Sequence, residues 1–83
     1  MKIVFKLFAS LSDRLPSERK GNCLELEVEE GTTVADMIAR YRIPERSAHL
    51  VLVNGVFIAP PERLARCLSE GDELAIWPPI AGG

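Results

Sequence analysis

The chain has 83 residues, of which 47% are hydrophobic and 27% are charged, a composition typical of a small globular domain. Its 10 basic and 12 acidic residues give a net charge of −2, and this absence of a basic excess argues against nucleic acid as a partner. No apolar run approaches the roughly 18 residues of a membrane-spanning helix. We therefore expect residues 1–83 to form one cytoplasmic domain without membrane contact.

Two cysteines and one histidine are too few for a disulfide scaffold or a structural metal site. Cys23 and Cys67 stand in no paired motif, and we expect both to be small buried hydrophobic residues. His49 is expected at the entrance of a strand, without a chemical role. A Gly-rich phosphate loop and a catalytic pair of carboxylates are both missing. The sequence therefore predicts no metal, no bound cofactor and no self-contained enzyme.

Two segments alternate with period two and predict the first two strands. Residues 2–8 place Ile3, Phe5 and Leu7 on one face. Residues 24–29 alternate leucine or valine with glutamate, so one face of this strand is expected to be in water.

A helix is expected to begin at Thr33, which can cap it together with Asp36 three residues later. Pro44 is expected to end the helical segment, since proline disfavours helical backbone at the residue before it. Four apolar residues in between have helical spacing and share one face: Val34, Met37, Ile38 and Tyr41.

The second half of the chain predicts three further elements. Residues 50–58 form a hairpin, because Asn54-Gly55 is the strongest short-range turn signal. Residues 62–68 are expected to form one or two helical turns, and residues 73–77 the last strand. The side chains expected to face inward from the helical turns are Leu64, Cys67 and Leu68.

The order strand, strand, helix, hairpin and final strand predicts an α+β domain with one main helix on one face of a mixed four- to five-stranded sheet. This is the ubiquitin-like β-grasp, in which the first and last strands are adjacent and parallel. A ferredoxin-like order fits less well, because here the helix follows the second strand. The predicted core consists of Ile3, Phe5, Leu7, Leu26, Val28, Val34, Ile38, Val51, Val53, Leu74 and Ile76.

Strand parity predicts an apolar surface on the face that the helix leaves uncovered. The inward residues of the hairpin are expected to be Val51, Val53, Val56 and Ile58. Leu52 and Phe57 then point to the opposite face, where Phe8 and Trp77 also fall and become near neighbours. Contiguous exposed apolar residues of this kind are typical of a protein-binding surface.

The last six residues form an unusual tail, Pro78-Pro79-Ile80-Ala81-Gly82-Gly83. The two prolines stiffen the exit from the sheet, while the two glycines have no side chains and adopt nearly any backbone conformation. Such a flexible tail over residues 78–83 can enter a narrow channel and deliver an ionised carboxylate.

The ending Trp77-Pro78-Pro79-Ile80-Ala81-Gly82-Gly83 resembles the aromatic-Pro-Pro-Val-x-Gly-Gly ending of the small subunit of molybdopterin synthase, in the MoaD/ThiS sulfur-carrier family. The opening over 4–9, the capped helix at Thr33, the Asn54-Gly55 turn and the turn over 71–73 match that family's landmarks in order. The resemblance covers the whole chain, although Trp77 replaces the more usual phenylalanine.

The resemblance implies a non-catalytic sulfur donor. An E1-like adenylating enzyme would activate the Gly83 carboxylate with ATP, with Gly82 as its companion, and a sulfurtransferase or cysteine desulfurase would supply sulfur to form a thiocarboxylate. The large subunit of molybdopterin synthase would then receive the tail and build the dithiolene of the molybdenum cofactor. The partner-binding residues would be Phe8, Leu52, Phe57, Trp77, Pro78, Pro79, Ile80 and Ala81.

Other functions are also compatible with this sequence. A thiamin-pathway carrier would feed thiazole synthase, although such relatives tend to lack the Pro-Pro before the tail. A tungsten pathway would use the same pterin chemistry. A ubiquitin-like modifier would join Gly83 to lysines of other proteins, and a plain β-grasp interaction module would not use Gly83 at all.

Overall fold

The computed structural model describes residues 1–79, so the predicted sites at Ile80, Ala81, Gly82 and Gly83 lie outside the described residues. Its strands are β1 (Lys2–Leu7), β2 (Cys23–Glu27), β3 (Leu50–Val53), β4 (Val56–Phe57) and β5 (Glu73–Trp77). Its α-helix is α1 (Val34–Arg40). Its 3-10 helices are η1 (Ala9–Arg14), η2 (Glu45–Ser47) and η3 (Pro60–Glu62).

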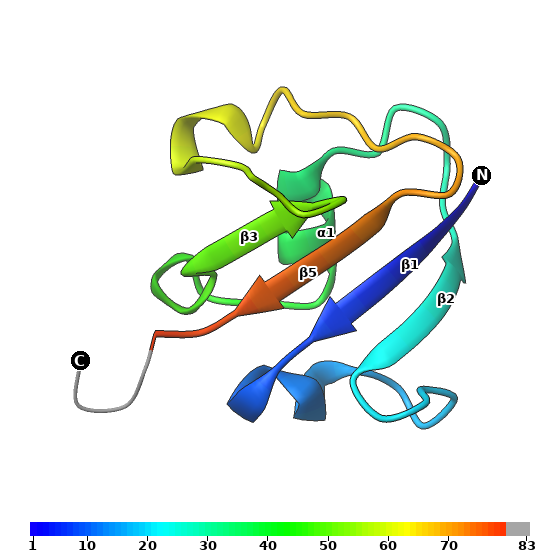
Figure 1. Cartoon of the computed structure of the whole chain (residues 1–83), viewed down its shortest axis with the longest axis vertical. Coiled ribbons are helices and arrows are strands. Elements are labelled where there is room, and N and C mark those ends of the chain that lie inside the picture. The colour runs from blue at the N-terminus through cyan, green and yellow to red at the C-terminus, as the bar shows by residue number, and fades with distance from the viewer. Residues whose placement is uncertain (80–83) are drawn as a thin grey trace.

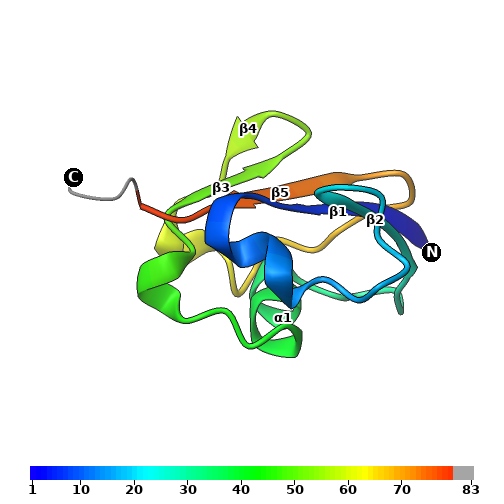
Figure 2. The same ribbon diagram turned by 90° about the horizontal axis from the view of Figure 1, so that it is seen from below.

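The five strands form one mixed sheet in the order β2-β1-β5-β3-β4. The two central strands, β1 and β5, run parallel, and the other neighbours are antiparallel. Figure 1 shows β1 and β5 side by side, and Figure 2 shows α1 on one side of the sheet. The predicted α+β class and the β-grasp arrangement, with parallel first and last strands, are confirmed.

The core lies between α1 and the sheet. All the predicted core residues are buried except Leu26 and Ile38, which are partly buried and pack against the others. The loops and 3-10 helices contribute buried residues that the strand and helix patterns do not include: Leu11, Leu15, Ile43 and Ala48.

The start of α1 has the predicted capping box. The Thr33 hydroxyl accepts a hydrogen bond from the Asp36 N–H at 3.0 Å, and the Asp36 carboxylate accepts one from the Thr33 N–H at 2.9 Å. Both bonds satisfy backbone N–H groups that have no partner within the helix, which fixes where the helix begins.

Val56 was predicted to be part of the core, and this is wrong. Its side chain is 64% exposed, although Val53, opposite it in the hairpin, is buried. The reason is that β4 has only two residues and lies at the edge of the sheet, where the hairpin bends away from α1 (Figure 2). The chain returns to the core only at Ile58, which is buried as predicted.

The segment 62–68 also differs from its prediction. It contains no regular helix after η3, so helical spacing does not apply, and Leu64 is 79% exposed while Leu68 is buried. Cys67 is exposed and Cys23 is only partly buried, so the expectation that both cysteines are buried is wrong. Cys23 is the first residue of β2 and lies opposite Lys6 of β1.

The hairpin turn is tied to the start of β5 by side-chain bonds. Asn54 and Gly55 have φ values of 52° and 82°, the left-handed conformation that a type I′ turn requires. The Asn54 amide donates to the Asp72 carboxylate at 2.8 Å, and its oxygen accepts from the Glu73 N–H at 2.9 Å. Asp72, which is buried, accepts a further bond from the Ser69 N–H at 2.8 Å.

Replacing Asn54 with glycine should lower the free energy of unfolding by about 1–2 kcal/mol. The variant loses the two side-chain hydrogen bonds of Asn54, to the Asp72 carboxylate and from the Glu73 N–H, whereas glycine still allows the turn conformation. Chemical denaturation measures the change. Ser17→Gly, at an exposed loop position, is the control for the backbone entropy of glycine. Equal losses in both variants would show that the two side-chain bonds contribute nothing.

Candidate functional site

An apolar surface covers part of the sheet face that is turned away from α1. It consists of Phe8, Leu50, Leu52, Phe57 and Trp77. The strand register brings these residues together, because Leu50 lies opposite Trp77 and Leu52 lies opposite Phe57. Phe57 is 52% exposed, and Phe8, Leu52 and Trp77 are partly exposed. The predicted placement of Phe8, Leu52, Phe57 and Trp77 on one uncovered face is therefore confirmed.

Phe8 and Trp77 form an aromatic stack at the end of the two central strands. Their ring centroids are 4.2 Å apart and their planes differ by 1°. The parallel register pairs Leu7 with Ile76, and the Phe8 N–H donates to the Ile76 carbonyl at 3.1 Å. Phe8 and Trp77, which follow Leu7 and Ile76 in the two strands, therefore lie side by side. The predicted contact between Phe8 and Trp77 is confirmed, and it fixes both rings on the apolar surface.

Leu50 belongs to this surface but was missed by the sequence reasoning. It is 38% exposed and pairs with Trp77 across the sheet. Strand alternation could have identified it, because Leu50 lies two residues before Leu52 in β3 and therefore points to the same face of the sheet.

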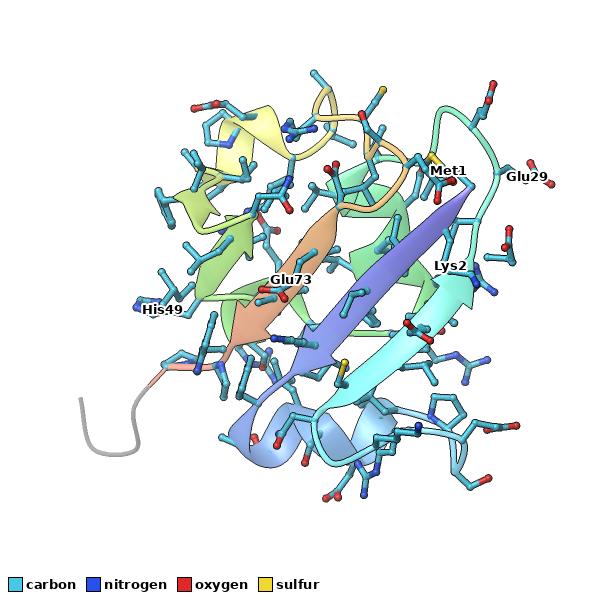
Figure 3. All side chains as sticks on the ribbon, turned by 45° about the vertical axis from the view of Figure 1, so that its right-hand side comes forward. Met1, Lys2, Glu29, His49 and Glu73 are labelled. Carbon is cyan, nitrogen blue, oxygen red and sulfur yellow. The ribbon has the colours of Figure 1, made fainter. Side chains whose placement is uncertain are left out.

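Charged residues border the apolar surface on this face. Lys6 and Glu73 form an ion pair at 2.9 Å, and this hydrogen bond, followed by the negative charge of Glu73, raises the pKa of the Lys6 amine above its usual value. Figure 3 shows Glu73 over β5 on this side of the sheet. An apolar area bordered by charged groups has the organisation of a protein interface, with an apolar centre and a polar rim.

The apolar surface adjoins the point where the tail leaves the sheet. β5 ends at Trp77, and the His49 N–H donates to the Trp77 carbonyl at 3.1 Å, which holds this end of the strand. Pro78 is partly buried and Pro79 is exposed. Figure 1 shows the chain leaving the sheet at the end of β5, and Figure 3 places His49 beside that end. A partner that holds the tail can therefore cover the apolar surface at the same time.

Within residues 1–79, no cluster of three or more His, Cys, Asp or Glu side chains could hold a metal ion. The same part of the chain has no helix long and apolar enough to cross a membrane. What the site presents is an apolar surface next to the point where the chain leaves the sheet.

Comparison with known proteins assigns the chain to a family. The sequence profile of the ThiS family matches residues 6–83, nearly the whole chain and including Gly82 and Gly83. The chain belongs to the ThiS family. This confirms the resemblance to the MoaD/ThiS proteins that the tail and the element order indicated. No curated protein sequence matches this ThiS-family chain.

Several solved structures have the same fold as this ThiS-family chain. SAMP1 from Haloferax volcanii is 27% identical, with a TM-score of 0.68 and complete coverage of both chains. A putative molybdopterin converting factor subunit 1 from Pyrococcus furiosus is 22% identical, with a TM-score of 0.64 and coverage of 95% of this chain and 98% of that one. In a complex of subunits 1 and 2 of the molybdopterin-converting factor from Helicobacter pylori, the matching chain is 17% identical, with a TM-score of 0.60 and complete coverage of both chains.

Proposed function

We propose that this ThiS-family protein is a sulfur carrier whose Gly83 carboxylate is converted to a thiocarboxylate and donates sulfur for the dithiolene of molybdopterin. The observation that carries the proposal is the family match, which continues through Gly82-Gly83. The apolar surface supports it, because a carrier without a catalytic site of its own must be recognised by the enzymes that act on its tail.

The proposed chemistry has three steps, all on the Gly83 carboxyl group. A carboxylate oxygen attacks the α-phosphorus of ATP on an E1-like enzyme, and pyrophosphate leaves. The terminal sulfur of a persulfide, from a sulfurtransferase or cysteine desulfurase, then attacks the acyl carbon, and AMP leaves. A thiol reduces the resulting acyl disulfide and releases the thiocarboxylate. The carrier supplies the reacting group, and its partners supply the oriented catalytic residues.

The proposed sulfur acceptor is bound by the large subunit of molybdopterin synthase. The Trp77-Pro78-Pro79 exit favours this pathway over the thiamin pathway. The Helicobacter pylori chain that shares this fold comes from a protein–protein complex of subunits 1 and 2 of the molybdopterin-converting factor. We propose that the large subunit covers Phe8, Leu52, Phe57 and Trp77 together with Leu50, while Pro78, Pro79, Ile80 and Ala81 carry Gly82-Gly83 to the reaction site.

Supplying the thiocarboxylated chain to two acceptor systems tests the pathway. Incubated with a molybdopterin synthase large subunit and the pterin precursor, the chain should yield dithiolene and return to its carboxylate form. Thiazole synthase with its substrates should yield no product. The unmodified chain is the control for sulfur from other sources. Turnover only with thiazole synthase would contradict the molybdopterin assignment and leave the sulfur-carrier role intact.

A second candidate is a ubiquitin-like protein modifier, in which Gly83 forms an isopeptide bond with lysine. The likeness to SAMP1 favours it, since that protein is by name a small archaeal modifier protein, and the match at 27% identity covers both chains completely. Adenylation of Gly83 is common to both functions. They differ in the nucleophile that follows, which is a persulfide for the carrier and a lysine amine for the modifier.

A further inference from the structure

Arg63 is a charged residue inside the fold, on the side of the sheet that α1 covers. It is only 5% exposed. Its Nε donates to the Ile58 carbonyl at 3.1 Å, and its Nη1 donates to the Ala48 carbonyl at 2.8 Å. Its Nη2 is buried and has no hydrogen-bond partner among the described residues. Buried polar nitrogens nearly always have a partner, so the two free N–H groups of Nη2 require an explanation.

The positive charge of Arg63 also has no carboxylate within ion-pair distance among the described residues. None of the ion pairs among residues 1–79 includes it. Burial lowers the pKa of its guanidinium from the usual value, and the charge of Glu45 acts in the opposite direction without forming an ion pair. Arginine nevertheless stays protonated in proteins, so a buried cation is held by two carbonyl oxygens alone.

Arg63 is one of the residues that line a cavity of about 370 Å³, and we name it the Arg63 cavity. It lies between α1 and the segments around η2 and η3, which Figure 2 shows on the same side of the sheet. Its volume falls within the range of small-molecule sites. Besides Arg63 and Glu45, its walls are mainly apolar, formed among others by Ala35, Ile38, Ala39, Ile43, Ala48 and Leu64.

The feature that favours an anion is the guanidinium itself, which has unpaired donors, because the only other charged residue in the lining of the Arg63 cavity is Glu45. Arg63 also borders an adjoining cavity, which contains Arg46 and His49 with Glu45 as its one acidic residue. A phosphate dianion would need several donors, whereas one guanidinium edge matches a carboxylate. Because Nη2 is covered in this structure, a ligand would reach it only after a side chain at the cavity rotates, and Glu45 and Leu64 are exposed residues of the lining.

We propose that the Arg63 cavity binds a small branched aliphatic carboxylic acid. Its hydrocarbon part would pack against the apolar residues of α1, and its carboxylate would accept hydrogen bonds from the free donors of Arg63. The site lies on the opposite side of the sheet from the apolar surface that we assign to docking. It therefore does not depend on the proposed sulfur-carrier function.

Titration of the isotope-labelled full chain with 4-methylpentanoate tests this proposal by NMR. The amide signals of Ala35, Ala39 and Leu64 and the side-chain Nε–H signal of Arg63 should shift saturably. The neutral 4-methylpentanamide, which has the same shape, should bind roughly tenfold more weakly, because a charge-assisted bond is replaced by a neutral one. No saturable shift with the acid, or equal affinity for the acid and the amide, would overturn the proposal.

Two variants of α1 provide a matched test that leaves Arg63 in place. Ala39→Leu adds a side chain that fills the Arg63 cavity, and it should abolish the shifts caused by 4-methylpentanoate. Arg40→Leu introduces the same side chain at the next exposed position, outside the cavity, and should bind the acid like the original chain. Unchanged binding in Ala39→Leu would place the ligand elsewhere and contradict the proposal.

Discussion

A chain extended by one alanine after Gly83 is expected to form no thiocarboxylate. The extension moves the terminal carboxylate away from Gly83 and adds a Cβ that a channel fitted to two glycines would exclude. Deletion of Gly83 should have the same effect, because the carboxylate then falls short of the reaction site. The measurement is the intact mass of the chain after incubation with ATP, an E1-like enzyme and a sulfur source.

The folding of the extended chain provides the control for this prediction. The described core ends with β5, so the denaturation midpoint should not change. A second control carries a longer extension with a protease site placed so that cleavage regenerates Gly83, and cleavage should restore thiocarboxylation. If the uncleaved, extended chain still supports dithiolene synthesis, the role assigned to Gly83 is wrong.

Replacing Phe57 with aspartate should weaken binding to the large subunit by about 2–4 kcal/mol, which is roughly 30-fold to 1,000-fold in Kd. The aromatic ring is half exposed in the free chain, and a partner that covers it would gain its burial. The free energy of unfolding should change by no more than about 0.5 kcal/mol, because the side chain contributes little to the core. Calorimetric titration and chemical denaturation of the same variant measure both quantities.

Val56→Asp is the matched control for Phe57→Asp. Val56 is the neighbouring residue of β4 and is 64% exposed, but its side chain points to the other side of that strand. It should leave partner binding nearly unchanged. Trp77→Asp is a less clean test, since it also breaks the stack on Phe8. Equal weakening by Val56→Asp and Phe57→Asp would mean that added negative charge, and not the loss of the aromatic ring, weakens binding.

Most of the fold could be predicted because strand alternation and helix capping act locally. The parallel pairing of β1 and β5 followed from the element order, and it predicted that Phe8 lies beside Trp77. The same reasoning failed at Val56, because alternation assigns a side to each residue without showing how far the strand continues along the sheet. A two-residue edge strand leaves both of its sides in water.

The burial of Arg63 could not be read from the sequence. Charged residues are almost never fully buried unless they are paired, so the expectation for such a residue in a loop is exposure. The two carbonyl groups that hold its guanidinium belong to Ala48 and Ile58, and only the tertiary structure brings them together. Leu64, whose helical spacing pointed inward, is instead exposed beside it, because no regular helix forms there.

The intact mass of the chain recovered from its native cells tests the sulfur-carrier function most directly. The account predicts a fraction whose mass reflects the exchange of one oxygen for one sulfur atom, located at Gly83 by fragmentation and absent from the chain extended by alanine. Isopeptide bonds between Gly83 and lysines of other proteins, without any sulfur-containing form of the free chain, would contradict the account and identify a protein modifier.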